Sequence, residues 1–166
     1  MENIPGVAAM AAALEDALDR MGDEAARQWA LTDRLRAGLA EIPGVEVHGH
    51  RTQRVPHIVC LSVPDLDAEI LGMALDDRGF RLAAGSSCSG APGEASSVVE
   101  HMGLPGRVSF RIGTGAATTA EDVERFLAML PELVEELRTI GRASEAAMAR
   151  YLAEPRSDGE GTGGLP

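Results

Sequence analysis

The first forty residues of the chain repeat apolar side chains with the spacing of an amphipathic helix. The pattern predicts a helix over residues 7–40, and the Pro-Gly pair at 43–44 marks its end. Gly22 interrupts the pattern and Asp23 can start a new helix, so we expect a kink or a short break there. The apolar positions are Val7, Met10, Leu14, Leu18, Met21, Leu31, Leu35 and Leu39.

The middle of the chain changes to short runs that are typical of β-strands. Residues 45–48 alternate apolar and polar side chains, and residues 58–63 form a run rich in β-branched side chains. Asp67 can cap a helix that ends near Gly79, and residues 80–82 are a further short strand candidate. These segments predict a small sheet whose strands are separated by a helix.

The pattern of short elements continues beyond a loop. Small residues at 85–93 indicate that loop, and a short helix over 98–102 is expected to stop at Gly103. Residues 107–112 alternate like another strand.

Two helices and a tail complete the predicted elements. Hydroxyl caps at 118–119 precede two carboxylates, which strongly favours the start of a helix over 120–138. A final helix is expected over 142–153, and residues 154–166, rich in Ser, Gly, Glu and Pro, are expected to be a disordered tail. The element order predicts one α/β domain over 1–153, of the α+β two-layer type, with a long N-terminal helix and a small sheet packed on helices.

The charge of the chain excludes some classes of partner. The 166 residues carry a formal charge of −11, which argues against binding to nucleic acid or to an anionic membrane surface. All 15 basic residues are Arg, so no lysine amine is present to form a Schiff base. The N-terminus lacks the features of a signal peptide and no apolar run approaches the ~20 residues of a membrane span. We therefore expect a cytoplasmic protein with reduced thiols.

The two cysteines lie in contrasting sequence contexts. Cys88 lies among Ser and Gly, where a thiol is accessible and can move between partners, although an incidental cysteine in a polar loop is an alternative. Cys60 lies inside the strand run of 58–63 and is expected to be a small core residue.

Arg111 is the second candidate for chemistry. It stands in a strand of small and apolar residues, where its guanidinium can bind a carboxylate with two hydrogen bonds. The alternative is an arginine on an edge strand that faces water. The four histidines and two cysteines lack the spacing of a metal site, so we expect no bound metal.

Four segments in register resemble one family of enzymes. Residues 82–90 and 94–104, which read LAAGSSCSG and EASSVVEHMGL, resemble the cysteine loop of the cysteine desulfurases. These are pyridoxal-phosphate enzymes of fold type I in the class V aminotransferase superfamily. Residues 108–123, which read VSFRIGTGAATTAEDV, resemble that family's arginine strand and the helix cap after it. Residues 3–6 and 55–58 match the start of a long helix and a strand entry in the same order.

This resemblance implies a role for two residues. Cys88 matches the cysteine that takes sulfur from L-cysteine as a persulfide, leaving L-alanine, and Arg111 matches the arginine that binds the substrate carboxylate. The resemblance covers only the C-terminal small domain of that family. The large domain, which carries the Schiff-base lysine and other groups that hold pyridoxal 5'-phosphate, is expected to come from elsewhere, and the chain is not expected to be active alone.

The partners implied are a large-domain chain acting in trans and a protein that accepts the sulfur. An exposed apolar face on helix 7–40 also makes self-association a reasonable expectation. Two alternatives remain open: a non-catalytic carrier or interaction domain that receives persulfide without generating it, and an inactive remnant of a cysteine desulfurase.

Overall fold

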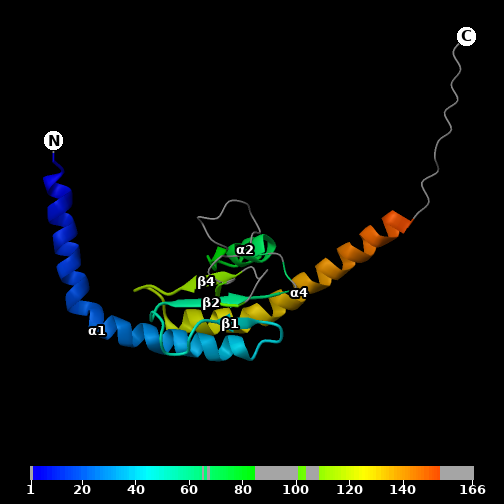
Figure 1. Ribbon diagram of the computed structural model, residues 1–166, viewed down its shortest axis with the longest axis horizontal. Helices are drawn as coiled ribbons and strands as arrows, with labels where there is room; N and C mark the ends of the chain where they lie inside the picture. The colour runs from blue at the N-terminus through cyan, green and yellow to red at the C-terminus, as the bar shows by residue number, and fades with distance from the viewer. Residues whose placement is uncertain (1, 65, 67, 85–100, 104–108, 154–166) are drawn as a thin grey trace, which may run out of the picture.

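The computed structural model describes residues 2–64, 66, 68–84, 101–103 and 109–153. These residues form an α/β domain in which long helices cover one face of a four-stranded antiparallel sheet (Figure 1). The predicted fold class is confirmed. The predicted loop at 85–93, most of the short helix before Gly103 and the tail at 154–166 lie outside the described residues.

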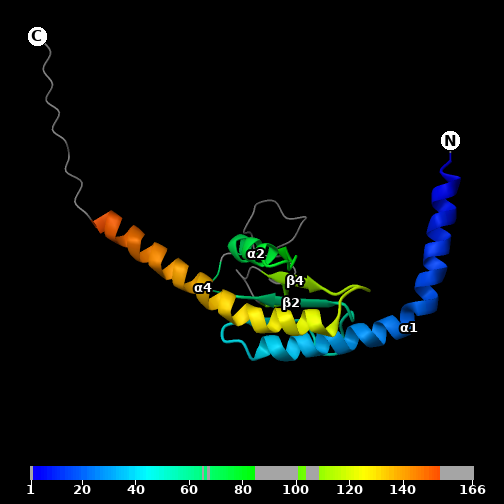
Figure 2. The same cartoon turned by 180° about the vertical axis from the view of Figure 1, so that it is seen from behind.

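The long N-terminal helix, α1, spans Ile4–Ala40. It begins earlier than the apolar pattern because the side chain of Asn3 accepts a hydrogen bond from the Gly6 N–H at 3.1 Å and because Pro5 suits the first turn. Of the kink or short break expected at Gly22, the break is absent, since α1 is one continuous helix. Its first half bends away from the rest of the domain in both views (Figures 1 and 2).

The sheet contains β1 (Glu46–His48), β2 (Ile58–Ser62), β3 (Ala83–Ala84) and β4 (Phe110–Gly113) in the order β1-β2-β4-β3. All neighbouring strands are antiparallel.

The strand predicted over residues 80–82 is wrong. The Phe80 ring packs edge-on against Phe126, with ring centroids 5.2 Å apart, and strand pairing begins only at Ala83. The chain first reverses at Gly79, whose φ of 81° is a left-handed conformation that glycine adopts without strain. Phe80 therefore packs against the helical layer through Phe126 and does not pair within the sheet.

The C-terminal helix, α4, spans Ala120–Ala153 and joins the two helices that the sequence predicts. Thr119 caps it as expected: its hydroxyl accepts from the Asp122 N–H at 3.1 Å, and the Asp122 carboxylate accepts from the Thr119 N–H at 3.0 Å. Hydrogen bonds that the Thr119 N–H and hydroxyl donate to its carboxylate lower the pKa of Asp122. The expected separation near Gly141 does not occur, because one glycine in an exposed helix costs only about 1 kcal/mol.

The core lies between the sheet and the helices. The second half of α1, the first half of α4 and α2 (Ala68–Asp77) bury their apolar sides there. Phe110, Leu61 and Val59 point into this core from the sheet and are at most 2% exposed. The largest fully buried side chains on the helices are Leu35, Leu39, Leu71, Leu75, Leu130, Leu133 and Val134.

The first half of α1 extends beyond this core. Only the later apolar positions of the predicted stripe, from Leu31 onward, are buried. The earlier ones form an exposed apolar stripe in which each side chain is 56–69% exposed. The stripe consists of Ile4, Val7, Met10, Leu14, Leu18 and Met21. In the part of the chain that the structure describes, no helix is long and apolar enough to cross a bilayer.

Candidate active site

A row of side chains crosses the sheet on the face opposite the core. In the strand register, Cys60 of β2 pairs with His48 of β1 on one side and with Arg111 of β4 on the other. Directly paired residues project from the same face of a sheet, whereas Val59 and Leu61 alternate with Cys60 and enter the core. The row therefore places a thiol and a guanidinium side by side, away from the helical layer.

Arg111 occupies an interior position of this row. Its strand, β4, lies between β2 and β3, so the alternative of an edge-strand arginine is wrong. The residue is nevertheless exposed, because the covering helices lie on the other face. A guanidinium on an interior strand has a fixed backbone, and its exposed position lets solvent and solutes reach it.

Cys60 is a free thiol that lies in β2 as predicted, but it is half-buried and is not among the core residues. Burial raises the pKa of the Cys60 thiol. A hydrogen bond with Ser109 and the positive charges of Arg111 and Arg36 oppose that rise. Cys60 is consequently mostly a neutral thiol near pH 7, which makes it a weak nucleophile.

Cys88 lies outside the described residues, so the structure places only the chain that leads to it. β3 ends at Ala84, four positions before Cys88, and Ala83 pairs directly with Arg111. The last described residues before Cys88 therefore lie on the strand next to Arg111.

Arg27 of α1 fixes the loop that follows β4, and the sequence does not reveal this role. Its guanidinium donates to the carbonyl oxygens of Thr118 at 2.5 Å, Gly115 at 2.8 Å and Ala116 at 3.2 Å. Glu24 binds the same guanidinium at 2.7 Å, and hydrogen bonds from Arg27 and Gln28 lower the pKa of Glu24 to about 2. Arg27 therefore ties the end of the Arg111 strand to α1.

A hollow lies at this junction of α1 with the end of β4. It has a volume of about 380 Å³, and its lining includes Gln28, His57 and Thr114. The Thr114 hydroxyl donates to the side-chain oxygen of Gln28, and the Thr114 N–H donates to the His57 carbonyl at 2.9 Å. Residues this far apart in sequence give no spacing signal, so the cluster could not be predicted.

The histidines are used for structure rather than gathered around an ion. His48 is hydrogen-bonded to Ser62 at 2.8 Å, and His50 accepts from the backbone N–H of Gln53 at 2.8 Å. Among the residues with described positions, no group of three His, Cys, Asp or Glu side chains could hold a metal ion.

The two thiols are expected to differ sharply in alkylation. In the native protein at neutral pH, a brief iodoacetamide pulse should label Cys88 first, because its neighbours in sequence are small and polar. Cys60 should label slowly, and its rate should rise as the pH is raised through 9, because its raised pKa limits the thiolate fraction. Peptide mass mapping measures both rates, and a denatured sample provides the reference. Faster labelling of Cys60 at neutral pH would contradict the half-buried position.

Comparison with known proteins identifies the family. Residues 1–126 match the family model described as aminotransferase class-V, so the chain belongs to that family. Its curated relatives are cysteine desulfurases, which makes it a cysteine desulfurase-like domain. It is 33% identical over 142 residues to cysteine desulfurase IscS of Methanosarcina thermophila, covering 84% of this chain and 35% of that protein. It is 34% identical over 143 residues to cysteine desulfurase 2 of Trichormus variabilis, covering 84% of this chain and 36% of that protein.

The fold agrees with that family. A solved NifS-like protein shares it with a TM-score of 0.70, at 22% identity over 82% of this chain and 35% of that one. The chain spans about a third of the length of the curated relatives it matches. Members of the family are pyridoxal-phosphate enzymes.

Proposed function

We propose that this chain is the small domain of a cysteine desulfurase, in which Arg111 binds the carboxylate of L-cysteine and Cys88 accepts its sulfur. The observation that carries the proposal is the position of Arg111: interior in the sheet, exposed, and paired with the strand that leads to Cys88. An interior strand fixes the backbone of Arg111, so its guanidinium can orient a carboxylate relative to the thiol.

The sulfur balance of the proposed reaction is simple. The bond between Cβ and Sγ of the substrate breaks, and a new S–S bond forms to Sγ of Cys88. L-cysteine and the Cys88 thiol thereby become L-alanine and a Cys88 persulfide, with no external oxidant. The persulfide sulfur then passes to an acceptor protein. The family suggests that this sulfur is used in iron–sulfur cluster assembly. The thiolate is the required form of Cys88, because the neutral thiol is a poor nucleophile.

These 166 residues do not fit covalent attachment of pyridoxal phosphate. That attachment needs a lysine amine, and the chain contains none. The cofactor and its lysine therefore belong to polypeptide outside this sequence in our proposal. The contribution of this chain is confined to substrate orientation through Arg111 and sulfur acceptance through Cys88.

The exposed apolar stripe of α1 supports a partner for this domain. Six apolar side chains face solvent along a helix that the core does not cover, and such a continuous apolar surface is unusual on a solitary domain. The remaining two thirds of each relative has no counterpart in these residues. We propose that a large domain covers the stripe, and self-association through the same stripe is the competing outcome.

A second candidate function is a persulfide carrier or interaction domain, with an inactive remnant as its limiting case. The absence of lysine favours it, because sulfur acceptance by Cys88 needs no cofactor if another enzyme generates the persulfide. The two functions differ in whether Arg111 must hold free L-cysteine.

Complementation tests the proposal. The purified chain with pyridoxal phosphate and L-cysteine is expected to release no sulfide above its Cys88→Ser variant, since free cofactor reacts slowly by itself. Addition of the N-terminal two thirds of the Methanosarcina thermophila relative, produced as a separate chain, is expected to restore sulfide release. A covalent fusion of the two pieces provides a control for weak association.

Two results would decide against the desulfurase proposal. Turnover by the isolated chain well above its Cys88→Ser variant would mean that no large domain is needed. Inactivity of the fusion, combined with rapid uptake of persulfide sulfur from a donor enzyme onto Cys88, would favour the carrier.

A further inference from the structure

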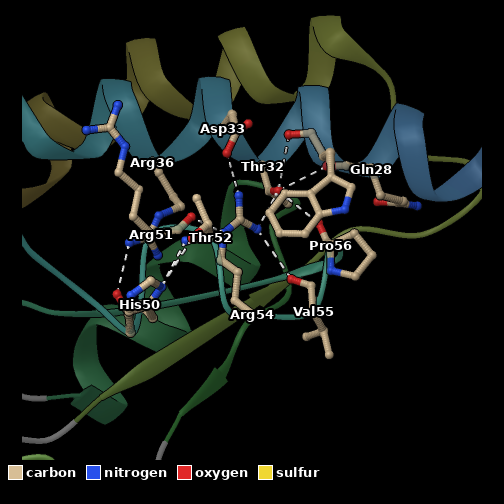
Figure 3. A network of polar contacts seen from close by, with 12 residues as sticks. Gln28, Thr32, Asp33, Arg36, His50, Arg51, Thr52, Arg54, Val55 and Pro56 are labelled. Carbon is tan, nitrogen blue, oxygen red and sulfur yellow. Dashed lines mark hydrogen bonds and ion pairs between the residues drawn. The ribbon is translucent and has the colours of Figure 1, made fainter.

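Three arginines gather beside one carboxylate on the outer side of α1, in a chain whose net charge is −11. An open groove of about 800 Å³ lies there, between α1 and the loop after β1. Arg36, Arg51 and Asp33 line it, and Arg54 forms an ion pair with Asp33. Figure 3 shows Asp33 and Arg36 on the helix and Arg51 and Arg54 on the loop beside it. This basic groove is separate from the row that contains Arg111.

Arg54 holds two residues that line the basic groove, Trp29 and Asp33. Its guanidinium is 4.1 Å from the centre of the Trp29 ring, and its side chain is only 8% exposed. It donates to the Thr32 hydroxyl at 2.9 Å and to the Asp33 carboxylate at 2.5 Å (Figure 3). The charge of Asp33 is thereby engaged by Arg54, which leaves the other two guanidiniums without that carboxylate as a direct partner.

Arg36 is held in place by backbone carbonyls rather than by an acid. Its guanidinium donates to the carbonyl oxygens of His48 at 2.9 Å and of Gly49 at 3.2 Å. Burial lowers the pKa of Arg36, and the positive charges of Arg54 and Arg51 lower it further, whereas the charges of Asp33 and Cys60 raise it. An anion in the groove would offset this repulsion.

The loop that carries Arg51 and Thr52 is ordered around one histidine. The His50 Nδ1 accepts from the backbone N–H of Thr52 at 3.2 Å and of Gln53 at 2.8 Å, and the Arg51 carbonyl accepts from Arg54 at 3.3 Å. The side chains of Arg51 and Thr52 are exposed on this ordered backbone, and the Thr52 hydroxyl lies 3.4 Å from His50 Nδ1. A guanidinium fork and a hydroxyl are typical ligands for phosphate oxygens.

The lining of the groove is apolar in part. This apolar side consists of Ala37, Ala40, Val47 and Trp29. A volume of about 800 Å³ exceeds what a bare ion needs, so an organic body can lie against this side while its charged end meets the arginines.

We propose that the basic groove binds a small organic phosphomonoester, with its phosphate on Arg36, Arg51 and Thr52 and its apolar body against Trp29 and Val47. The phosphate group is the recognised chemistry, and free inorganic phosphate is its alternative source. The proposal does not rest on the proposed desulfurase function, since none of the groove residues belongs to the Arg111 row, which the groove meets only where Arg36 binds the His48 carbonyl.

Trp29 provides a direct measurement, because it is the single tryptophan of the chain. Phenyl phosphate should change its fluorescence saturably, at constant ionic strength set with sodium chloride. Inorganic phosphate and benzoate are titrated in parallel. We expect phenyl phosphate to bind about tenfold more tightly than inorganic phosphate, with no saturable response to benzoate or chloride. Equal affinity for the two phosphates would assign the site to free phosphate and overturn the role of the apolar side.

Variants test the assigned contacts. Arg51→Gln should weaken phenyl phosphate about tenfold or more, which corresponds to the loss of one charge-assisted contact. Its side chain is exposed, so the melting temperature should be unchanged. Arg142→Gln, an exposed arginine on the far part of α4, is the matched control and should bind normally. Unchanged affinity in Arg51→Gln, or no saturable response to either phosphate, would overturn the proposal.

Discussion

Replacement of Cys88 by serine is expected to abolish sulfide release in the complemented assay, by about a thousandfold or more. Serine keeps the size and polarity of the loop residue but cannot form the S–S bond of a persulfide. Its hydroxyl also remains protonated at neutral pH, where a thiolate is accessible. Sulfide release per complex gives the rate, and the intact mass of the chain after exposure to L-cysteine reports whether one sulfur atom has been added.

Cys60→Ser is the matched control for this prediction. The Cys60 thiol is half-buried with a raised pKa, so its removal should leave the rate within about twofold of the parent. The added sulfur should appear on the Cys60→Ser chain and be absent from the Cys88→Ser chain. Persulfide on Cys60 in the Cys88→Ser chain would contradict the assigned roles and make Cys60, beside Arg111, the sulfur acceptor.

The sequence predicts a helix end well where residues within one helical turn of each other form the cap. The Thr119 and Asp122 cap depends on residues three apart, and the structure forms it as expected. The start of α1 was placed three residues late because the cap residue Asn3 and Pro5 precede the first periodic apolar position. The division near Gly141 was wrong because a weak local preference does not end a helix that has formed on both sides.

The errors in the sheet have a different cause. The sequence predicts a strand at Phe80, but its ring packs against Phe126, which lies 46 positions later in the chain. Strand order likewise depends on long-range pairing, so the sequence could not exclude an edge position for Arg111. Alternation along β2 does place Cys60 on the face opposite Val59, yet it does not tell which residue of another strand stands beside it.

For the candidate site, the sequence suggests the reacting residues but not the residues that hold them in place. Cys88 and Arg111 are named by the family resemblance, whereas Arg27, which holds the loop after β4, contacts carbonyls about 90 residues away. Backbone carbonyls carry no side-chain signature, so no sequence pattern marks their partner. The same reasoning applies to Arg36 and Arg54, whose hydrogen bonds go mainly to carbonyl oxygens and a hydroxyl.

Replacement of Arg111 by alanine is expected to weaken L-cysteine binding in the complemented assay by about a hundredfold. A charge-assisted guanidinium–carboxylate pair contributes about 2–3 kcal/mol, which corresponds to that change in affinity. The effect should appear mainly as a higher KM, because saturating substrate can still reach Cys88. Initial rates of sulfide release over a range of L-cysteine concentrations separate KM from kcat.

Two further variants accompany this prediction: one separates charge from hydrogen bonding at Arg111, and the other is a control at a different arginine. Arg111→Gln keeps hydrogen-bond donors without the charge and should recover only a small part of the affinity. A lysine is unsuitable, because it would introduce the amine that the chain lacks. Arg81→Ala removes a guanidinium that is 91% exposed and paired only loosely with Asp76 at 3.2 Å, so it should leave KM unchanged. Since Arg111 is exposed, all three chains should retain their melting temperature. An unchanged KM in Arg111→Ala would remove the substrate-binding role and leave persulfide carriage as the function that Cys88 can still perform.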